Sequence, residues 1–330
     1  MANILIAGGA GFIGSHTLLA LDAAGHSIIS YDNLSNGHRD SVIAGTLIEG
    51  DLHDGTLLDQ VFTDNRIDAV VHFAAFIEAG ESVVNPMTFY DNNVAGSLSL
   101  IQAMVRSGVN KIVFSSTAAV YGQQDNQQLL SETLPKLPIN PYGHSKWMVE
   151  CMLRDVAATG QLDAIALRYF NAAGSDPEGR LGERHDPETH LIPLVLDAAR
   201  GARPDIKIFG NDYDTPDGTC IRDYVHVSDL ASAHVLAVDS LLARTEKQTG
   251  SYVAMNLGTS NGHSVLQVIE TAKQVTGIDF KVAQQPRRPG DPASLVADAS
   301  RAQHVLGWRP ERSDLRTMIE DTWRYRRKLK

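Results

Sequence analysis

The sequence predicts an α/β fold: a doubly wound parallel sheet with helices on both faces, followed by a smaller mixed α/β domain toward the C-terminus. The first reason is that strand-like and helix-like segments alternate through the first half of the 330-residue chain. The second is that the chain opens with an apolar run leading into a glycine-rich turn. The third is that the alternation fails beyond residue 173. We therefore expect one domain over residues 1–173 and a second over 174–330, with some later strands and helices packing back on the first.

The opening run, residues 3–7, is short enough to be a buried strand, and a helix is expected over residues 15–24. Between them lie Gly8, Gly11 and Gly14. The first glycine allows a tight turn, the second lets a pyrophosphate approach the backbone, and the third lets the helix pack closely against the strand. The N–H groups and the positive end of the helix dipole then face the phosphates. This stretch therefore predicts a dinucleotide site.

A second strand, Ser27–Tyr31, carries the next part of this site. Asp32 follows it directly, where a carboxylate is placed to accept a hydrogen bond from an adenosine ribose. The polar, turn-rich stretch 33–37 is suited to wrapping the adenosine. Because Asp32 would repel a 2′-phosphate and no arginine follows it immediately, we expect NAD rather than NADP. These features together predict a Rossmann-type domain.

The remaining strands of the first half are expected at 46–49, 68–75, 111–116 and 163–170, with a helix over 86–107. Asp51 lies just beyond the third strand, at the edge where such sheets bind ligands, and it could equally cap the next helix. The stretch 123–138 is polar and punctuated by proline, which predicts a loop over the site. Asn140 and Pro141 are residues favoured at helix starts, so a helix begins there.

The second half is a mixture of shorter elements. Residues 176–189 are charged and rich in proline and glycine, which indicates a domain junction or a mobile loop. Helices are expected at 191–201, 230–242 and 264–276, a short strand and a polar loop over 206–218, a strand at 252–257, and a basic loop at 287–291 before a helix-rich C-terminus.

The composition limits the possible classes of function. A net charge of −10 argues against nucleic acid or an anionic membrane as a partner, although a local pair of arginines can still bind a small anion. No apolar run approaches membrane-spanning length. Cys151 and Cys220 offer no disulfide framework and fit a reducing compartment, and no signal peptide precedes the first strand. We expect a cytoplasmic protein.

The chemistry is expected from Tyr142 and Lys146, which lie four residues apart on the same helix face. A free phenol is a poor base because its pKa is about 10, but an adjacent ammonium and a positively charged nicotinamide favour the phenolate. A phenolate beside an oxidised nicotinamide can take a hydroxyl proton while the carbon loses hydride. Thr117, at the end of the fifth strand, can hydrogen-bond the same oxygen.

These residues carry a resemblance to a known family. The Gly8/Gly11/Gly14 loop, Ser115-Ser116-Thr117 and Tyr142-x-x-x-Lys146 resemble the extended short-chain dehydrogenase/reductase superfamily. Further motifs, spread over nearly the whole chain, resemble the UDP-glucose 4-epimerase family within it: His72-Phe73-Ala74, Gly80-Glu81-Ser82-Val83, Tyr90-Asp91-Asn92-Asn93, Arg168-Tyr169-Phe170-Asn171, Phe209-Gly210-Asn211-Asp212-Tyr213 and Arg222-Asp223-Tyr224-Val225-His226-Val227.

The resemblance implies a reaction on a tightly held NAD that interconverts UDP-glucose and UDP-galactose. Tyr142 removes the O4 proton of the sugar, C4 gives hydride to NAD, and the 4-keto sugar turns over and accepts the hydride on its other face. Nothing is consumed overall, which suits a cofactor that stays bound. The resemblance also implies a homodimer formed by helices near 90–107 and 142–159.

The resemblance further implies which residues bind each ligand. NAD would be lined by Gly8, Gly11, Phe12, Ile13, Gly14, Asp32, Asn33, Leu34, Ser35, Asn36, Gly37, Asp51, Leu52, Phe73, Ala74, Ala75, Asn92, Tyr142, Lys146 and Phe170. The UDP-sugar would be held by Thr117, Asn171, His190, Leu191, Phe209, Arg222, Tyr224, Arg288, Asp291 and Leu295. The arginines among them suit a diphosphate, which needs a charged, fork-like donor.

Two positions depart from the family pattern. Ile77 stands where the family often has a lysine near the NAD phosphates, so either NAD is held more weakly or another group compensates. Leu295 stands at a gate near the sugar that is commonly a tyrosine. Leucine is shorter than tyrosine but bulkier than the cysteine or serine of an open gate. We therefore expect UDP-glucose and UDP-galactose as the main pair, with weaker turnover of the N-acetylated pair.

No metal site is expected. The cluster His185-Asp186-Pro187-Glu188-Thr189-His190 is interrupted by proline, and its five-residue histidine spacing does not place both rings on one helix face. His190 is instead expected to face the nucleotide.

Several other functions are weighed against this one. A nucleotide-sugar 4,6-dehydratase usually carries an Asp-Glu pair directly after the serine or threonine, where this chain has Ala118-Ala119. A dehydrogenase or reductase with net turnover of its cofactor does not explain the motifs in the second half of the chain that resemble a nucleotide-sugar site. Intact Tyr142, Lys146 and Thr117 argue against a non-catalytic NAD-binding protein. A 4-epimerase of UDP-N-acetylhexosamines or of UDP-pentoses is the nearest alternative.

Overall fold

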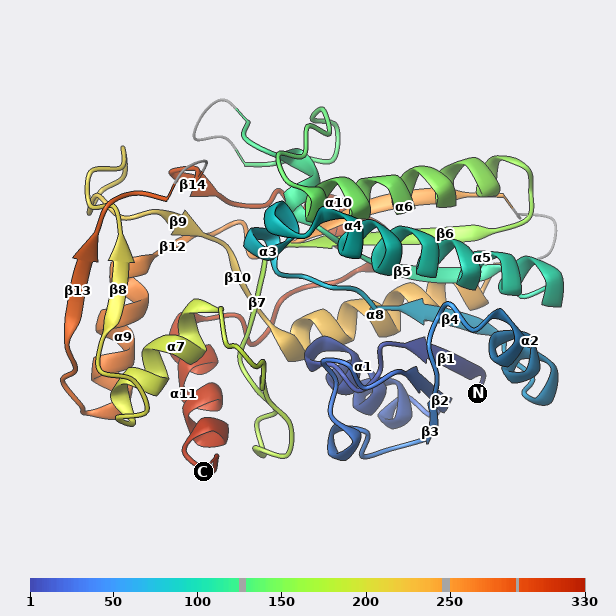
Figure 1. Ribbon diagram of the computed structural model, residues 1–330, viewed down its shortest axis with the longest axis horizontal. Coiled ribbons are helices and arrows are strands. Elements are labelled where there is room, and N and C mark those ends of the chain that lie inside the picture. The colour runs from blue at the N-terminus through green and yellow to red at the C-terminus, as the bar shows by residue number, and fades with distance from the viewer. Residues whose placement is uncertain (125–128, 245–249, 289–290, 330) are drawn as a thin grey trace.

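The computed structural model describes residues 1–124, 129–244, 250–288 and 291–329, so parts of the predicted loops 123–138 and 287–291 lie outside the described residues. Its centre is a seven-stranded parallel sheet in the order β11-β6-β5-β4-β1-β2-β3 (Figure 1). The strands are β1 (Asn3–Ala7), β2 (Ser27–Asp32), β3 (Thr46–Glu49), β4 (Ala69–His72), β5 (Lys111–Thr117), β6 (Asp163–Tyr169) and β11 (Tyr252–Leu257). The strand order reverses between β1 and β4, and ligands bind at the carboxyl ends of strands beside such a point.

Each of these strands matches a predicted one, and the bounds differ by three residues at most. The last strand, β11, comes from the second half of the chain and pairs with β6 in parallel. The main sheet is therefore completed by a segment that follows much of the smaller lobe in sequence.

Helices cover both faces of the sheet (Figure 1). One face carries α2 (Gly55–Asp64), α5 (Gly96–Ser107) and α6 (Pro141–Ala158), and the other carries α1 (Phe12–Ala23), α8 (Val227–Leu242) and α10 (Ser300–Leu306). In β1, Leu5 packs in the apolar cluster of the first face, whereas Ile4 and Ile6 pack in that of the second. Strands buried on both faces read as continuous apolar runs. The predicted doubly wound α/β fold is confirmed.

The predicted helix over 86–107 is three consecutive segments: α4 (Pro86–Phe89), the π-helical η2 (Tyr90–Ala95) and α5, with α3 (Ala79–Val84) before them. In the π-helical segment, the buried Asn93 side chain accepts from the N–H of Phe76 at 2.8 Å and donates to its carbonyl oxygen at 3.0 Å. Its amide also donates to the Ser145 hydroxyl at 3.0 Å. Asn93 thus ties the chain after β4 to α6, while its neighbour Asn92 lines the cavity described below.

Two helix starts show the capping chemistry directly. The Asn140 side chain accepts from the N–H of Gly143 at 2.8 Å, and Pro141 is the first residue of α6, as predicted. At α2 the cap is Asp54, whose carboxylate accepts from the N–H of Leu57 at 2.9 Å. The suggestion that Asp51 caps this helix is therefore wrong, because an equally good capping residue lies directly before the helix.

The rest of the chain forms a smaller mixed α/β lobe, on the left in Figure 1, where the C-terminus also lies. Its elements are β7 (Asn171–Ala173), α7 (Leu191–Ala199), β8 (Ile206–Phe209), β9 (Ile221–Arg222), β10 (Tyr224–His226), β12 (His263–Ser264), α9 (Val265–Thr276), β13 (Val282–Gln285), β14 (Ser294–Leu295) and α11 (Leu315–Arg326). Ile206 and Ile208 of β8 pack among apolar side chains of α7, α9 and α11 in a core of their own. Two 3-10 turns, η1 (Arg39–Ser41) and η3 (Ala118–Tyr121), complete the elements. Across the described ranges, we find no helix with the length and apolar character needed to cross a bilayer.

Candidate active site

A cavity opens at the carboxyl ends of the main-sheet strands, on the side of the smaller lobe. Its walls are formed by the glycine loop, by residues at or just after the carboxyl ends of the strands β2, β3, β4, β5 and β6, and by the first turns of α6 and α7. The described residues of the predicted loop 123–138 do not line it; Leu130 instead pairs with Ala297. The cavity is thus bordered by the strand ends that the sequence marks as the ligand edge.

The glycine loop lines the cavity with its backbone. A Cβ atom on Gly14 would lie 2.1 Å from the carbonyl oxygen of Gly8, and one on Gly8 would lie 2.5 Å from the amide nitrogen of Ala74. Gly8 also has a φ of +85°, which L side chains rarely adopt. Gly11 precedes α1 without any side-chain cap, so the first N–H groups of the helix are left for a ligand. These residues fit the pyrophosphate of a dinucleotide.

Asp32 is held at the end of β2 by backbone N–H groups on both carboxylate oxygens. Ala10 donates to Oδ2 and Leu34 donates to Oδ1, each at 2.9 Å. Burial raises the pKa of Asp32, whereas these two N–H groups lower it. The Asn33 side chain donates to Asp51 at 2.7 Å, which ties the ends of β2 and β3 together. Asp32 and Asp51 both line the cavity, and these hydrogen bonds hold them in place there.

The structure brings nearly all residues that the resemblance assigns to NAD to this cavity. Those that line it are Gly8, Gly11, Phe12, Ile13, Gly14, Asp32, Asn33, Ser35, Asn36, Gly37, Asp51, Leu52, Phe73, Ala74, Ala75, Asn92, Tyr142, Lys146 and Phe170. Leu34 does not line it; it has a φ of +57°, and its N–H serves Asp32.

Tyr142 and Lys146 both line the cavity from α6, and Thr117 lines it from the end of β5. The Lys146 side chain is buried, and its ammonium donates to the carbonyl oxygen of Ser115 at 2.9 Å. The Thr117 hydroxyl oxygen accepts from the N–H of Ala119 at 3.1 Å, so its proton is free to donate toward the cavity. The geometry offers a phenol, an ammonium and a hydroxyl donor to one bound group.

The resting charge of this trio is set by burial. Burial raises the pKa of Tyr142 to about 12, against the nearby Thr117 hydroxyl, and the Glu78 carboxylate raises it further. Burial lowers the pKa of Lys146 to about 7, while Glu150 opposes this change. The phenol is therefore neutral in the unliganded cavity. A positive charge brought beside it would favour the phenolate.

The helix that carries Tyr142 and Lys146 is anchored on the sheet by a buried ion pair. Arg168 of β6 donates through Nε to Glu150 of α6 at 2.8 Å, and both side chains are almost fully buried. Glu150 also accepts from the Ser116 hydroxyl and, at 2.6 Å, from the Tyr252 hydroxyl of β11. Glu150 lies one helical turn after Lys146, so this network fixes the height of the reactive residues above the strand ends.

The residues assigned to the UDP-sugar divide into two groups. Thr117, Asn171, His190, Leu191 and Tyr224 line the cavity. The others, Phe209, Arg222, Arg288, Asp291 and Leu295, do not. They lie on short strands of the smaller lobe and on the segment between β13 and β14.

Two contacts organise that outer group. The Arg288 guanidinium lies over the Phe209 ring, 3.9 Å from its centroid, and Arg222 forms an ion pair with Asp291. Leu295 and Phe170 both pack against a buried apolar cluster of Val120, Tyr121 and Leu130. Phe170 is the member of that cluster that reaches the cavity itself.

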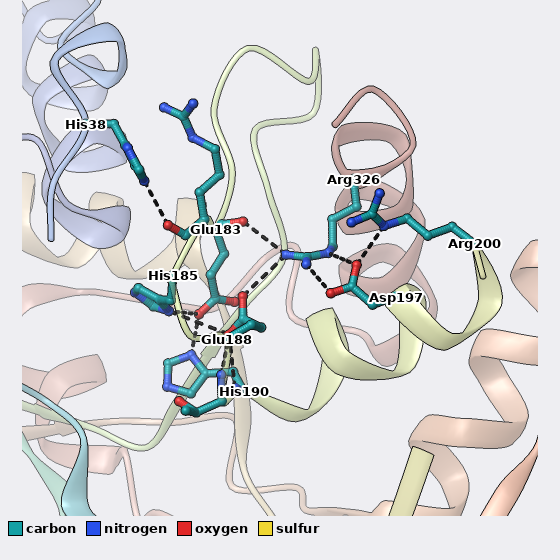
Figure 2. A network of polar contacts seen from close by, with 10 residues as sticks. His38, Glu183, His185, Glu188, His190, Asp197, Arg200 and Arg326 are labelled. Atoms are coloured by element: carbon teal, nitrogen blue, oxygen red, sulfur yellow. Dashed lines mark hydrogen bonds and ion pairs between the residues drawn. The ribbon is translucent and has the colours of Figure 1, made fainter. Parts of the chain in front are cut away.

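The loop 176–190 supplies a further wall. His185 and His190 line the cavity, and both Nδ1 atoms point to the buried Glu183, with Glu188 beside them (Figure 2). One ligand atom from each of these four residues lies within 4.8 Å of the others. The spacing argument against bringing both rings together is therefore wrong, because residues 185–190 are not helical. His190 lines the cavity, and its orientation toward the nucleotide stays a prediction.

Sequence reasoning missed several cavity residues: Tyr31, Gly50, Phe76, Glu78, Ser115, Tyr169, Ala172, Ala173, His185, Ile192 and Pro193. Most are neighbours of residues that it did assign, so taking whole strand ends would have found them. Glu78 is the exception in chemistry, because it places a carboxylate near the Tyr142 phenol. Its only sequence signal is its position shortly after β4.

Comparison with known proteins gives one consistent result. The model of the NAD dependent epimerase/dehydratase family matches residues 4–258. The UDP-glucose 4-epimerase of Rhizobium meliloti is 50% identical over 98% of this chain and 96% of its own length, and that of Halalkalibacterium halodurans is 49% identical over 98% and 95%. Among solved structures, the UDP-glucose 4-epimerase of Brucella ovis in complex with NAD has a TM-score of 0.93 at 45% identity, covering 98% of each chain. The Stenotrophomonas maltophila enzyme, with bound NAD and formylated UDP-arabinopyranose, has a TM-score of 0.95 at 40% identity, covering 100% of this chain and 99% of that one.

Proposed function

Because the chain belongs to the NAD dependent epimerase/dehydratase family, we propose that it interconverts UDP-glucose and UDP-galactose by inverting C4. It is an NAD-dependent isomerase. The observation that carries this proposal is that Tyr142, Lys146 and Thr117 line the same cavity as a glycine cradle that fits a pyrophosphate, with the Thr117 hydroxyl hydrogen-bonded to Tyr142.

NAD, when bound, supplies the acceptor and later the donor of the C4 hydride. Tyr142, as the phenolate, takes the proton from O4 of the sugar, and the neighbouring Lys146 ammonium favours that ionised form. The Thr117 hydroxyl donates to the same oxygen, because the hydrogen bond that it accepts from Ala119 does not use its proton. After the 4-keto sugar has turned its other face toward the cofactor, Tyr142 returns the proton to O4. Acid and base are thus one residue, and no water is consumed or released.

The two parts of the chain divide the binding. Residues 1–173 hold NAD through the glycine loop and the strand ends, and residues 174–330, together with Thr117 and Asn171, hold the nucleotide sugar. Arg222 and Arg288 are proposed to bind the diphosphate once their present partners, Asp291 and the Phe209 ring, share them with it. Anchoring the sugar through its diphosphate leaves the hexose free to turn between the two hydride transfers.

The decisive experiment supplies UDP-galactose to the purified protein without added NAD. Formation of UDP-glucose supports the proposal and also shows that NAD is retained. Elimination of water to a 4-keto-6-deoxy sugar would indicate a dehydratase, although Ala118 and Ala119 offer no acid–base pair. The absence of turnover by folded, NAD-loaded protein would overturn the enzymatic assignment.

We also propose a homodimer formed through α5 and α6, which lie on the same face of the sheet. Leu98 on α5 and Met148 on α6 are large apolar side chains that are 42% and 43% exposed. The nearby Met87 of α4 is 76% exposed. Light scattering on the parent chain and on Leu98→Asp tests this proposal, since the charged variant should be monomeric. A cytoplasmic location is proposed because Cys151 and Cys220 are both free thiols.

A further inference from the structure

A charged cluster in the loop 176–190 is not used by the proposed reaction. Buried Glu183 accepts from His190 Nδ1 through Oε1, and His185 Nδ1 lies 3.2 Å from the same oxygen (Figure 2). The two imidazole rings lie edge to face, with centroids 5.2 Å apart. A single carboxylate, with a side chain only 1% exposed, therefore serves two histidines.

The donor set of this cluster resembles a metal site, but its acceptors are already engaged. Glu188 Oε1 accepts from the N–H groups of Thr189 and His190 at 2.9 and 3.0 Å, and Glu188 Oε2 lies 3.3 Å from Arg326. Arg326 of α11 is also held by Asp197 of α7. A metal ion would have to break these hydrogen bonds. The carboxylates of Glu183 and Glu188 are instead paired with the two histidines and with Arg326.

The protons on the two histidines are held firmly. Burial opposes a charge on His185, but Glu183 and Glu188 raise the pKa of His185 to about 10. Burial likewise opposes a charge on His190, and Glu183 raises its pKa as well. The same contacts lower the pKa of Glu183 to about 2, against the effect of burial. The shared carboxylate thus favours a proton on both rings, and the rings in turn favour its ionised form.

The free edges of these rings belong to the cavity. Both Nδ1 atoms are directed at Glu183, which leaves Nε2 of each ring as the nitrogen that is not turned toward this carboxylate. The His185 ring lies edge-on to Phe12, the first residue of α1, with centroids 6.5 Å apart. His190 directly precedes α7 and its first residue Leu191. His185 thus lies beside the start of α1, whose first N–H groups have no side-chain cap, and His190 lies directly before the start of α7.

We propose that His185 and His190 form a pair of cationic donors to two pyrophosphate groups, His185 to that of the dinucleotide and His190 to that of the nucleotide sugar, with Glu183 as their shared positioning residue. This inference rests on the proposed function. It also supplies the cation that Ile77 fails to provide on the dinucleotide side, since Ile77 lines the same cavity with an apolar side chain. Charge-assisted hydrogen bonds of this kind are about twice as strong as neutral ones.

The test measures ligand binding, not turnover. ADP-ribose, which carries the pyrophosphate of the cofactor, and adenosine, which does not, are titrated into nucleotide-stripped full-length protein by calorimetry at pH 7. UDP is titrated into NAD-loaded protein. His185→Gln should weaken the affinity for ADP-ribose about tenfold to a hundredfold. The affinities for adenosine and UDP should stay within about twofold of those of the parent chain. His190→Gln should show the reverse pattern, with UDP weakened and ADP-ribose retained. His304→Gln, at an exposed histidine of α10, is the matched control and should change nothing.

Glu183→Gln supplies the pH test. In the parent chain Glu183 raises the pKa of His190, so the affinity for UDP should change less between pH 6 and pH 8 than it does in the variant. In the variant, the loss of the carboxylate leaves burial to lower the pKa of His190. The affinity for UDP should then fall about tenfold as the pH rises from 6 to 8. The other charges near the rings, Glu188, Arg326, Asp197 and Arg200, are unchanged in this comparison.

Three results would overturn the proposal. Unchanged ADP-ribose affinity in folded His185→Gln would remove its anion-binding role. An equal loss of adenosine and ADP-ribose binding would show a structural role alone. Stoichiometric zinc in the purified protein that disappears in His185→Gln would show a metal site in place of the anion-binding pair. Turnover of UDP-galactose by the parent chain reports on the proposed function separately from all three.

Discussion

The two walls of the cavity bind ligand by different means. The wall formed by the glycine loop and the strand ends presents backbone N–H groups, and its shape depends on the absence of side chains at Gly8 and Gly14. The wall formed by residues 176–190 presents charged side chains, with Glu183 buried behind two histidines. The first wall is specified by local residue spacing. The second exists only once a loop without helix or strand has folded against α7 and α11.

The difference also concerns how each wall is held in place. The first wall is continuous with the core of the main sheet, and the buried pair Glu150–Arg168 fixes the reactive helix against it. The second wall is held by ion pairs that reach from the loop to Arg326 on α11. Changes in the first wall should therefore affect folding and chemistry, whereas changes in the second should affect ligand affinity.

The largest effect is expected from Arg168→Met. This change leaves the Glu150 carboxylate buried without its cation, which should lower the free energy of unfolding by about 3–5 kcal/mol. The control is Arg106→Met, which breaks the half-exposed pair with Asp59 and should cost about 1 kcal/mol or less. Urea denaturation of the parent and both variants measures the difference. Similar losses in the two variants would show that the buried pair does not anchor the reactive wall.

Tyr142→Phe should leave the fold and NAD binding largely intact, because only one hydroxyl is removed. Turnover should fall at least about a hundredfold, the low end for a positioned general base. Tyr90→Phe removes a hydroxyl from η2 and should retain full activity. Lys146→Ala should also reduce turnover strongly, because the phenolate loses its neighbouring cation. Near-normal activity of well-folded Tyr142→Phe would reject the assignment of the base.

Asp32→Asn tests whether the first wall selects the cofactor by charge. The parent chain should release NAD, not NADP, when it is denatured. The variant keeps a side-chain oxygen for the ribose but removes the negative charge that repels a 2′-phosphate. Its preference for NAD over NADP should fall about tenfold, about 1.4 kcal/mol, as measured by competitive binding. If the variant kept the preference of the parent chain for NAD over NADP, the shape of the 33–37 turn, and not the charge of Asp32, would select the cofactor.

The sequence predicts the first wall well because its signals are local. Glycine spacing, apolar runs and the Asn140–Pro141 helix start each depend on a few neighbouring residues, and the corresponding strands and helix start are observed. Capping by Asp51 was predicted wrongly because Asp54 lies three residues later with the same chemistry. The π-helical turn in 90–95 also leaves no mark in the pattern of apolar residues.

The second wall could not be predicted in the same way. The histidine spacing was judged against a helix, but residues 185–190 have no helical backbone, so their rings converge along a path that spacing does not reveal. The carboxylate that joins the rings, Glu183, carried no signal at all, because an isolated glutamate in a charged loop reads as a solvated residue. Its backbone carbonyl accepts from Arg326 of α11 at 3.2 Å, a contact with a helix that lies far away in sequence.

Leu295 gives the smallest expected effect, because it lies behind the cavity wall and not in it. Its side chain and that of Phe170 pack against the same buried cluster, and in the β14–β9 pairing Leu295 stands opposite Arg222. Any influence on the sugar must therefore pass through the position of Phe170. A change of one or two methylenes in a pocket is worth only about 1–3 kcal/mol, and an indirect contact should fall at the low end of that range.

Leu295→Tyr should therefore depress turnover of UDP-N-acetylglucosamine about tenfold while UDP-glucose and UDP-galactose change by about twofold or less, since the larger ring would push Phe170 into the space that an acetyl group needs. Leu295→Met, which conserves volume, is the matched control and should leave the ratio of the two activities unchanged. The measurement is kcat/KM for both sugar pairs on each variant. An equal loss with both pairs would mean that the substitution distorts the lobe as a whole, and Leu295 would then not be the gate.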